Sequence, residues 1–335
     1  MKIVSDFSRF ECEWGVVPYV NQDLLLHNDE ESDCVLFNGA AGLYDSDFRD
    51  TYRDYRRRCL LAVWSPCELI EGPSVYHFDD YVFFTEVYCC CPFTCHFMNQ
   101  FFGEEKFKYI PYPYTNHSVT RYNDHDALVS WFGGCHSQDH ASAIDTLRKF
   151  KHKYITTRRN VGPRGMDRRE RDYPTHVDLS TEDKLVEISR CRASLSFNKL
   201  YLRDAWDTIS HSRNDGNFLE GNLRNKAFSN FDEQIMPQFK VRNHEIASCK
   251  SLILAYKDPW NLIEDFYTPG EDFIPFSNFE ELNDILSDME NDADLYRDVA
   301  QNGFDKSQMY SVQKIYEYIK TNDESLISWS LDNVE

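Results

Sequence analysis

Short apolar runs that alternate with longer amphipathic segments are the feature that most constrains this fold. In the first hundred residues the runs are KIVSDF, DCVLFNG, CLLAVWS and DYVFFTEVY. They are rich in Val, Phe and Leu and lack strict alternation, which is typical of strands buried on both faces of a parallel sheet. After the Pro-rich stretch YIPYPYTNH the pattern restarts, with apolar runs at 127–132, 193–198 and 251–256. The alternation predicts an α/β protein with two Rossmann-like domains that face a cleft.

The chain has 335 residues, enough for two domains of roughly 150 residues each. We expect an N-terminal domain at 1–120, a second domain at 121–310, and a C-terminal helix at 311–335 that crosses back to the first. Helices are predicted at 138–150, at 238–249, after a Ser180 capping box, after an Asn278 or Ser277 cap, and at 292–304, where Gly303 is expected to end the helix.

Charge and cysteine content exclude several classes of partner and site. The formal net charge of −20 disfavours binding to nucleic acid or to an anionic membrane. No run of about 18 apolar residues is present, so we expect no transmembrane segment and a cytoplasmic site of action. Eleven Cys at irregular spacings suit reduced thiols. The one dense cluster, CCCPFTC, lacks a second Cys pair at a metal-closing distance, so no metal site is predicted.

The segment QFKVRNHEIASC, at 238–249, concentrates polar residues ahead of a buried strand. Taken as a helix, it places Gln238, Arg242 and Glu245 near one face and Lys240 and His244 on a second. A carboxylate can accept two hydrogen bonds from a ribose diol, and a basic side chain can neutralise a diphosphate. The alternative is an Arg242–Glu245 ion pair on a solvated face. The small residues at 247–249 favour tight packing of this helix against the sheet. They therefore favour ligand binding by its polar residues over a solvated ion pair.

The segment WFGGCHSQDH leaves the strand at 127–132 and enters a helix. Gly133 and Gly134 allow close approach of a ligand to the backbone, His136 offers a hydrogen-bond donor, and the helix N-terminus favours an anion. An ordinary strand-to-helix turn is the alternative.

Residues 237–304 resemble the C-terminal module of two-domain (GT-B) glycosyltransferases, especially the spore-maturation-type and exostosin-like branches. The matching features are an Arg-x-x-Glu helix at Arg242 and Glu245, a small-residue turn, the strand SLIL, the stretch PGEDFIPF and the helix end VAQNG. The resemblance is looser over 127–200 and only architectural before residue 120.

The resemblance implies a nucleoside diphosphate sugar, UDP- or GDP-linked, as donor and a glycan hydroxyl as acceptor, without a required metal. Glu245 matches the residue that holds the ribose, and Lys240 and Arg242 match basic residues beside the diphosphate. Gly133 and Gly134 would approach the phosphates. Many relatives place a further Glu where this chain has Pro237, so the stereochemical outcome stays open.

If the transfer inverts the configuration of the sugar, it needs a carboxylate or His as proton acceptor, which we expect in the N-terminal half. Asp6, which ends the first apolar run, and Glu86, taken to end a strand in DYVFFTEVY, are the candidate catalytic carboxylates. Each could instead be a capping or solvated group. A non-catalytic nucleotide- or glycan-binding module is the alternative function. A methyltransferase would be expected to show a Gly-rich loop after its first strand, and SDFSRFECEWG has none.

Overall fold

The structure is a computed structural model of the full chain. It describes residues 3–5, 34–38, 58–63, 84–89, 92–109, 125–133, 138–155, 176, 179–201, 235–310, 317, 318, 321 and 323. The chain divides into two compact units. The first comprises Met1–Thr115, Ala205–Phe239 and Val312–Glu335, and the second comprises Asn116–Asp204 and Lys240–Ser311.

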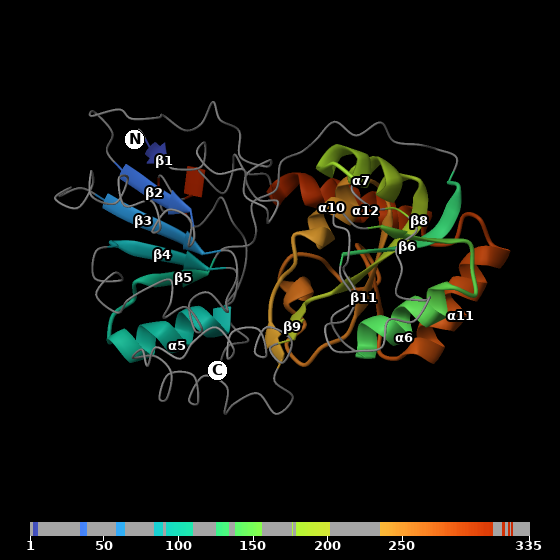
Figure 1. The fold of residues 1–335 in the computed structure, drawn as a ribbon, viewed down its shortest axis with the longest axis horizontal. Coiled ribbons are helices and arrows are strands. Elements are labelled where there is room, and N and C mark those ends of the chain that lie inside the picture. The colour runs from blue at the N-terminus through green and yellow to red at the C-terminus, as the bar shows by residue number, and fades with distance from the viewer. Residues whose placement is uncertain are drawn as a thin grey trace. The chain divides into compact units, whose positions relative to one another are not determined.

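The first unit contains a five-stranded parallel sheet in the order β1-β2-β3-β4-β5 (Figure 1). Its strands are β1 (Ile3–Ser5), β2 (Cys34–Asn38), β3 (Arg58–Val63), β4 (Glu86–Cys89) and β5 (Phe107–Tyr109), with helix α5 (Pro92–Phe102) between the last two. A short strand β10 spans Ile235–Pro237. Asn99 of α5 exchanges two hydrogen bonds with the backbone of Phe107, at 2.7 and 2.8 Å, and so ties the helix to the edge strand.

The second unit contains another five-stranded parallel sheet, in the order β12-β11-β8-β6-β7. Its strands are β6 (Ala127–Phe132), β7 (His152–Ile155), β8 (Cys191–Phe197), β11 (Leu252–Tyr256) and β12 (Ile274–Phe276), and the short β9 spans Lys199–Tyr201. The chain runs from β6 outward to β7 and then crosses to β8 on the other side of β6. The strand order therefore reverses between β6 and β8.

Helices cover both faces of this second sheet (Figure 1). The helices are α6 (Gln138–Leu147), α7 (Thr181–Ser189), α10 (Arg242–Ser248), α11 (Phe279–Asn291) and α12 (Arg297–Ser307), with 3-10 turns η4 (Leu262–Asp265) and η5 (Gln308–Tyr310). Helices α6 and α11 pack together on one face, and α10 packs against α7 and α12 on the other. The apolar side chains between these layers form the core, which includes Trp131, Ile144, Leu195, Leu254 and Leu286. The predicted α/β class with Rossmann-like units is confirmed.

The helix starts follow the predicted caps. The Ser180 hydroxyl accepts a hydrogen bond from the Asp183 amide at 3.0 Å, and the Asn278 side chain accepts from the amides of Glu280 and Glu281. Each cap satisfies amide donors that the first helical turn leaves without an intrahelical acceptor. The capping predictions at α7 and α11 are confirmed, with Asn278 as the capping residue of α11.

Three predicted helices have different bounds. The helix expected at 138–150 ends at Leu147. The helix expected at 238–249 begins only at Arg242, and the Lys240 amide donates to the side chain of Asn198. The helix expected to end at Gly303 continues to Ser307, so the prediction that Gly303 ends it is wrong. Gly303 is needed for packing, because a Cβ there would lie 2.5 Å from the carbonyl oxygen of Asp272.

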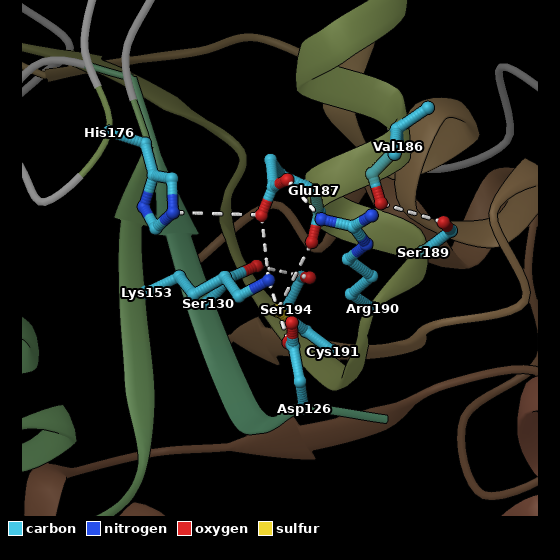
Figure 2. A network of polar contacts seen from close by, with 10 residues as sticks. All are labelled: Asp126, Ser130, Lys153, His176, Val186, Glu187, Ser189, Arg190, Cys191 and Ser194. Atoms are coloured by element: carbon cyan, nitrogen blue, oxygen red, sulfur yellow. Dashed lines mark hydrogen bonds and ion pairs between the residues drawn. The ribbon is translucent and has the colours of Figure 1, made fainter. Parts of the chain in front are cut away.

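A charged network lies at the amino-terminal edge of the second sheet (Figure 2). The Lys153 ammonium lies 2.7 Å from carboxylate oxygens of both Asp126 and Glu187, and Arg190 lies 2.8 Å from Glu187. Burial disfavours the Lys153 charge, but hydrogen bonds to Asp126 and Glu187 outweigh it and raise the Lys153 pKa. Because Glu187 belongs to α7 and Lys153 to β7, the network fixes the C-terminal end of α7 against the sheet.

Replacing Gly303 with Ala is expected to destabilise the protein. Ala favours a helix interior by about 1 kcal/mol over Gly, but the new Cβ must displace the Asp272 carbonyl. We expect a net loss of about 1–3 kcal/mol in the free energy of unfolding, measured by urea denaturation. Asp305→Ala, at an exposed site on the same helix, is the control and should change stability little. A Gly303→Ala protein as stable as the parent or more stable would contradict this packing account.

Candidate functional site

The reversal of strand order in the second unit marks the expected ligand position. In open parallel sheets, ligands bind beyond the carboxyl ends of the strands at the point where the order reverses. Here that point lies between the end of β6, at Phe132, and the end of β8, at Phe197. The strands described in the first unit follow one another in simple sequence order and show no such reversal.

Asn198, directly after β8, holds the start of α10 at this point. Its fully buried side-chain oxygen accepts hydrogen bonds from the Lys240 amide at 3.2 Å and from the Asn243 side chain at 2.6 Å. The Asn243 amide group also donates to the Lys240 carbonyl at 2.9 Å. The end of β8 therefore fixes the entry into the helix that carries Arg242 and Glu245.

Arg242 reaches back from α10 to the end of β6. Its guanidinium carbon lies 5.2 Å from the ring centroids of both Trp131 and Phe132. Gly133 follows with a φ of +112°, and a Cβ there would lie 2.5 Å from Arg242 Nη2. Only glycine leaves room for the guanidinium in this backbone conformation.

Burial sets the electrostatics of Arg242. Burial lowers the pKa of Arg242 to about 10, against the opposing effects of Glu245 and Tyr154. Since this pKa is still well above 7, the guanidinium stays charged at neutral pH. A cation with reduced hydration interacts more strongly with an anion than a fully hydrated one does.

Glu245 lies in the interior and not on a solvated face. Its side chain is 2% exposed, and Oε1 lies 2.6 Å from the ammonium of Lys184 in α7. Lys184 also lies 5.9 Å from the Phe132 ring centroid. The solvated Arg242–Glu245 pair considered as the alternative is therefore wrong, because Glu245 is enclosed. Arg242, Glu245 and Lys184, together with Phe132 and Gly133, form what we call the switch-point cluster.

His244 points to the opposite side of α10, into an aromatic cluster. It is fully buried, its Nδ1 lies 2.7 Å from the Tyr267 hydroxyl, and its ring packs against Phe266, Tyr267 and Tyr310. Burial lowers the pKa of His244 to about 3, so the ring is neutral at physiological pH. The structure thus separates His244 from Arg242 and Glu245, and we propose that it packs the helix and does not contact the donor.

The predicted position of Glu86 at the end of a strand is wrong. Glu86 begins β4, because the preceding Phe84 and Thr85 are not part of the strand. It therefore lies at the amino-terminal edge of a parallel sheet, away from the edge where such sheets bind ligands. Its carboxylate accepts a hydrogen bond from Tyr88 and lies 3.3 Å from the Lys108 ammonium. These contacts assign Glu86 to a structural ion pair.

Three other predicted site residues, Asp6, Gly134 and His136, lie outside the described residues. Lys240 is partly exposed and contributes its amide to the Asn198 contact. Sequence reasoning missed Asn198 and Lys184. The only sequence signal for Lys184 was its position one turn after the Ser180 cap, and this position does not indicate that Lys184 pairs with Glu245.

The described residues contain neither a cluster of metal ligands nor a membrane-spanning helix. Within the described part of the chain, no group of three or more His, Cys, Asp or Glu side chains is placed to hold a metal ion. No helix among the described residues is long and apolar enough to span a bilayer.

Comparison with known proteins supports the fold. Residues 204–320 match the family model described as glycosyl transferase-like. A sucrose-phosphate synthase from Thermosynechococcus elongatus is 10% identical with a TM-score of 0.53, and the match covers 88% of this chain and 74% of that one. Anabaena HepE, solved with UDP and glucose, is 12% identical with a TM-score of 0.55, and the match covers 88% of this chain and 78% of that one. No curated protein sequence matches. The chain thus has the GT-B fold, as predicted.

Replacing Gly133 with Ala should disrupt the switch-point cluster. The Cβ would collide with Arg242, and a φ of +112° is unfavourable for any residue with a side chain. We expect a loss of about 1–3 kcal/mol in the free energy of unfolding, measured with urea. Gly270→Ala is the matched control, because Gly270 has a φ of +80° and no atom within 4 Å of its Cβ position. Equal losses for the two variants would show that the Arg242 contact is unimportant.

His244 should make stability depend on pH. Its pKa falls from 6.5 to about 3 on folding, so between these values the unfolded chain binds a proton that the folded chain excludes. The resulting stability is complete above pH 6.5 and is lost as the pH falls, by about 1.4 kcal/mol per unit.

Urea unfolding of the wild type and His244→Phe at pH 7 and pH 5 tests this dependence. Between these values the wild type should lose about 2 kcal/mol more than the variant does. The exposed His96 supplies the control variant, His96→Asn, which should retain the pH dependence of the wild type. Parallel pH dependence in wild type and His244→Phe would refute a neutral buried imidazole.

Proposed function

We propose that this protein is a glycosyltransferase that moves a sugar from a UDP- or GDP-linked donor to a hydroxyl of a glycan acceptor, without a required metal. The observation that carries the proposal is the position of Glu245 and Arg242 at the reversal of strand order, within the segment that matches the glycosyl transferase-like family. Anabaena HepE, a structural neighbour, has been solved with UDP-glucose, which supports a nucleotide sugar as the donor class.

The switch-point cluster has the groups that such a donor requires. Glu245 would accept hydrogen bonds from the ribose hydroxyls, as in the spore-maturation-type and exostosin-like enzymes that this segment resembles. Arg242 and Lys240 would offset the diphosphate charge. Gly133 would let the backbone approach the phosphates without a side chain in the way. Arg242 is held over two aromatic rings, so its position is set before the donor binds.

In the reaction, the bond between the anomeric carbon and the diphosphate oxygen breaks, and the acceptor hydroxyl forms the new bond to that carbon. Arg242 would stabilise the negative charge that develops on the departing diphosphate. If the reaction inverts the configuration of the sugar, a protein base must take the proton of the attacking hydroxyl, and Asp6 is the proposed base because Glu86 is held in an ion pair. Pro237 stands where many relatives have a Glu, so the proposal covers either stereochemical outcome.

Calorimetric titration with UDP and GDP tests the proposed donor site. We expect the wild type to bind one of them and Glu245→Gln to bind it about 10-fold more weakly or worse, since a hydrogen bond to a charged group contributes about 1.5–3 kcal/mol. Arg242→Met should weaken binding similarly. Glu182→Gln, an exposed carboxylate on α7, is the control and should bind like the wild type. Unchanged affinity in both site variants would sink the assignment.

Turnover separates transfer from binding alone. Incubation with a panel of UDP- and GDP-sugars should release free nucleotide slowly, by hydrolysis of the donor, and Arg242→Met should reduce the rate. Binding without release from any donor would instead favour a non-catalytic nucleotide-binding module.

A further inference from the structure

We infer that Lys184 is a positioning residue that orients the Glu245 carboxylate and thereby lets the site select ribonucleotides over deoxyribonucleotides. The inference rests on the proposed function, because it assumes that Glu245 meets the ribose. It assigns a task to a residue on α7, a helix outside the 204–320 family match and the 237–304 segment that carries the resemblance.

The ion pair between the two residues is short and largely withdrawn from water. Lys184 Nζ lies 2.6 Å from Glu245 Oε1, and the two side chains are 15% and 2% exposed. A buried carboxylate is costly unless a charged or hydrogen-bonding partner compensates it. A carboxylate can accept about four hydrogen bonds, so the ammonium and the ribose hydroxyls can share this group. The ammonium fixes one oxygen and so sets the direction of the other.

Lys184 is presented by a helix that is anchored along its length. The Ser180 cap holds its start, and the Glu187–Lys153 pair holds its end against β7 (Figure 2). The thiol of Cys249, the C-cap residue of α10, donates to the Leu185 carbonyl at 3.3 Å, one residue beyond Lys184. These contacts set the register between α7 and α10, so Lys184 meets Glu245 in one defined geometry.

The position of Lys184 relative to Phe132 links it to the rest of the site. Lys184 Nζ and the Arg242 guanidinium lie 5.9 and 5.2 Å from the same Phe132 ring centroid. Both cations therefore lie near the end of β6, and Lys184 also pairs with Glu245. A pre-oriented acceptor binds a hydroxyl with less loss of side-chain freedom than a mobile one. Without Lys184, Glu245 remains present but is poorly oriented. The gain in affinity that a ribose 2′-hydroxyl gives should therefore fall.

The test compares UDP with 2′-deoxy-UDP, or GDP with 2′-deoxy-GDP if GDP is the nucleotide that binds. For the wild type we expect a preference of about 10-fold for the ribonucleotide. Lys184→Met should reduce this ratio to about 3-fold or less by weakening the ribonucleotide alone. Lys184→Arg should restore part of the ratio. Lys149→Met is the matched control, because Lys149 is exposed and contacts Asn283 of α11, on the face of the sheet opposite α7 and α10. Its loss should leave the ratio unchanged.

The outcomes distinguish a failure of the Lys184 inference from a failure of the proposed donor site. If Lys184→Met keeps the wild-type ratio, or weakens both nucleotides equally, the positioning inference is overturned while the donor site stands. If the wild type shows no preference for the ribonucleotide, and Glu245→Gln changes the affinity for neither nucleotide, the proposed contact between Glu245 and the ribose is itself wrong. Circular dichroism checks folding. If Lys184→Met does not fold, Lys184→Gln replaces it, since Gln keeps a donor but not the charge, and the same reduction of the ratio is expected.

Discussion

The reversal of strand order between β6 and β8 is the constraint on which the rest of the second unit depends. Parallel strands end at a common edge, and the crossing from β7 to β8 brings the ends of β6 and β8 next to each other. The polar groups of this edge then come from segments far apart in the sequence: Gly133 after β6, Asn198 after β8, and Arg242 and Glu245 in α10. The site follows from the topology before any single side chain is considered.

Buried charge is then balanced separately at the two ends of α7. Near its start, Lys184 pairs with Glu245 of α10 at the carboxyl edge. At its end, Glu187 pairs with Lys153 at the amino edge. Removing one member of such a pair leaves the other desolvated, which costs more than the pair itself contributes. The pairing with Lys184 explains why the Glu245 carboxylate can be so deeply enclosed.

Much of this arrangement was predictable from sequence because local rules decided it. The strand at 127–132, the caps at Ser180 and Asn278, and the placement of Arg242 and Glu245 in one helix all follow from patterns of a few residues. The errors came from contacts distant in sequence. Asn198 binds the Lys240 amide, so α10 starts later than its polar pattern indicates. The carbonyl of Asp272 demands a glycine inside α12, although a late helical glycine resembles a helix end. Lys184 could not be found, because nothing near it in sequence reveals a partner 61 residues away.

We propose that the switch-point cluster binds a nucleoside diphosphate in the second unit. A crystal structure of the protein soaked with UDP, or with GDP if that is the tighter ligand, tests it most directly. The account predicts ribose hydroxyls within hydrogen-bond distance of the Glu245 carboxylate, with Lys184 still paired to it, and phosphates beside Arg242 and the Gly133 backbone. Nucleotide density at another edge of the sheet, with Glu245 remaining enclosed by protein alone, would contradict it.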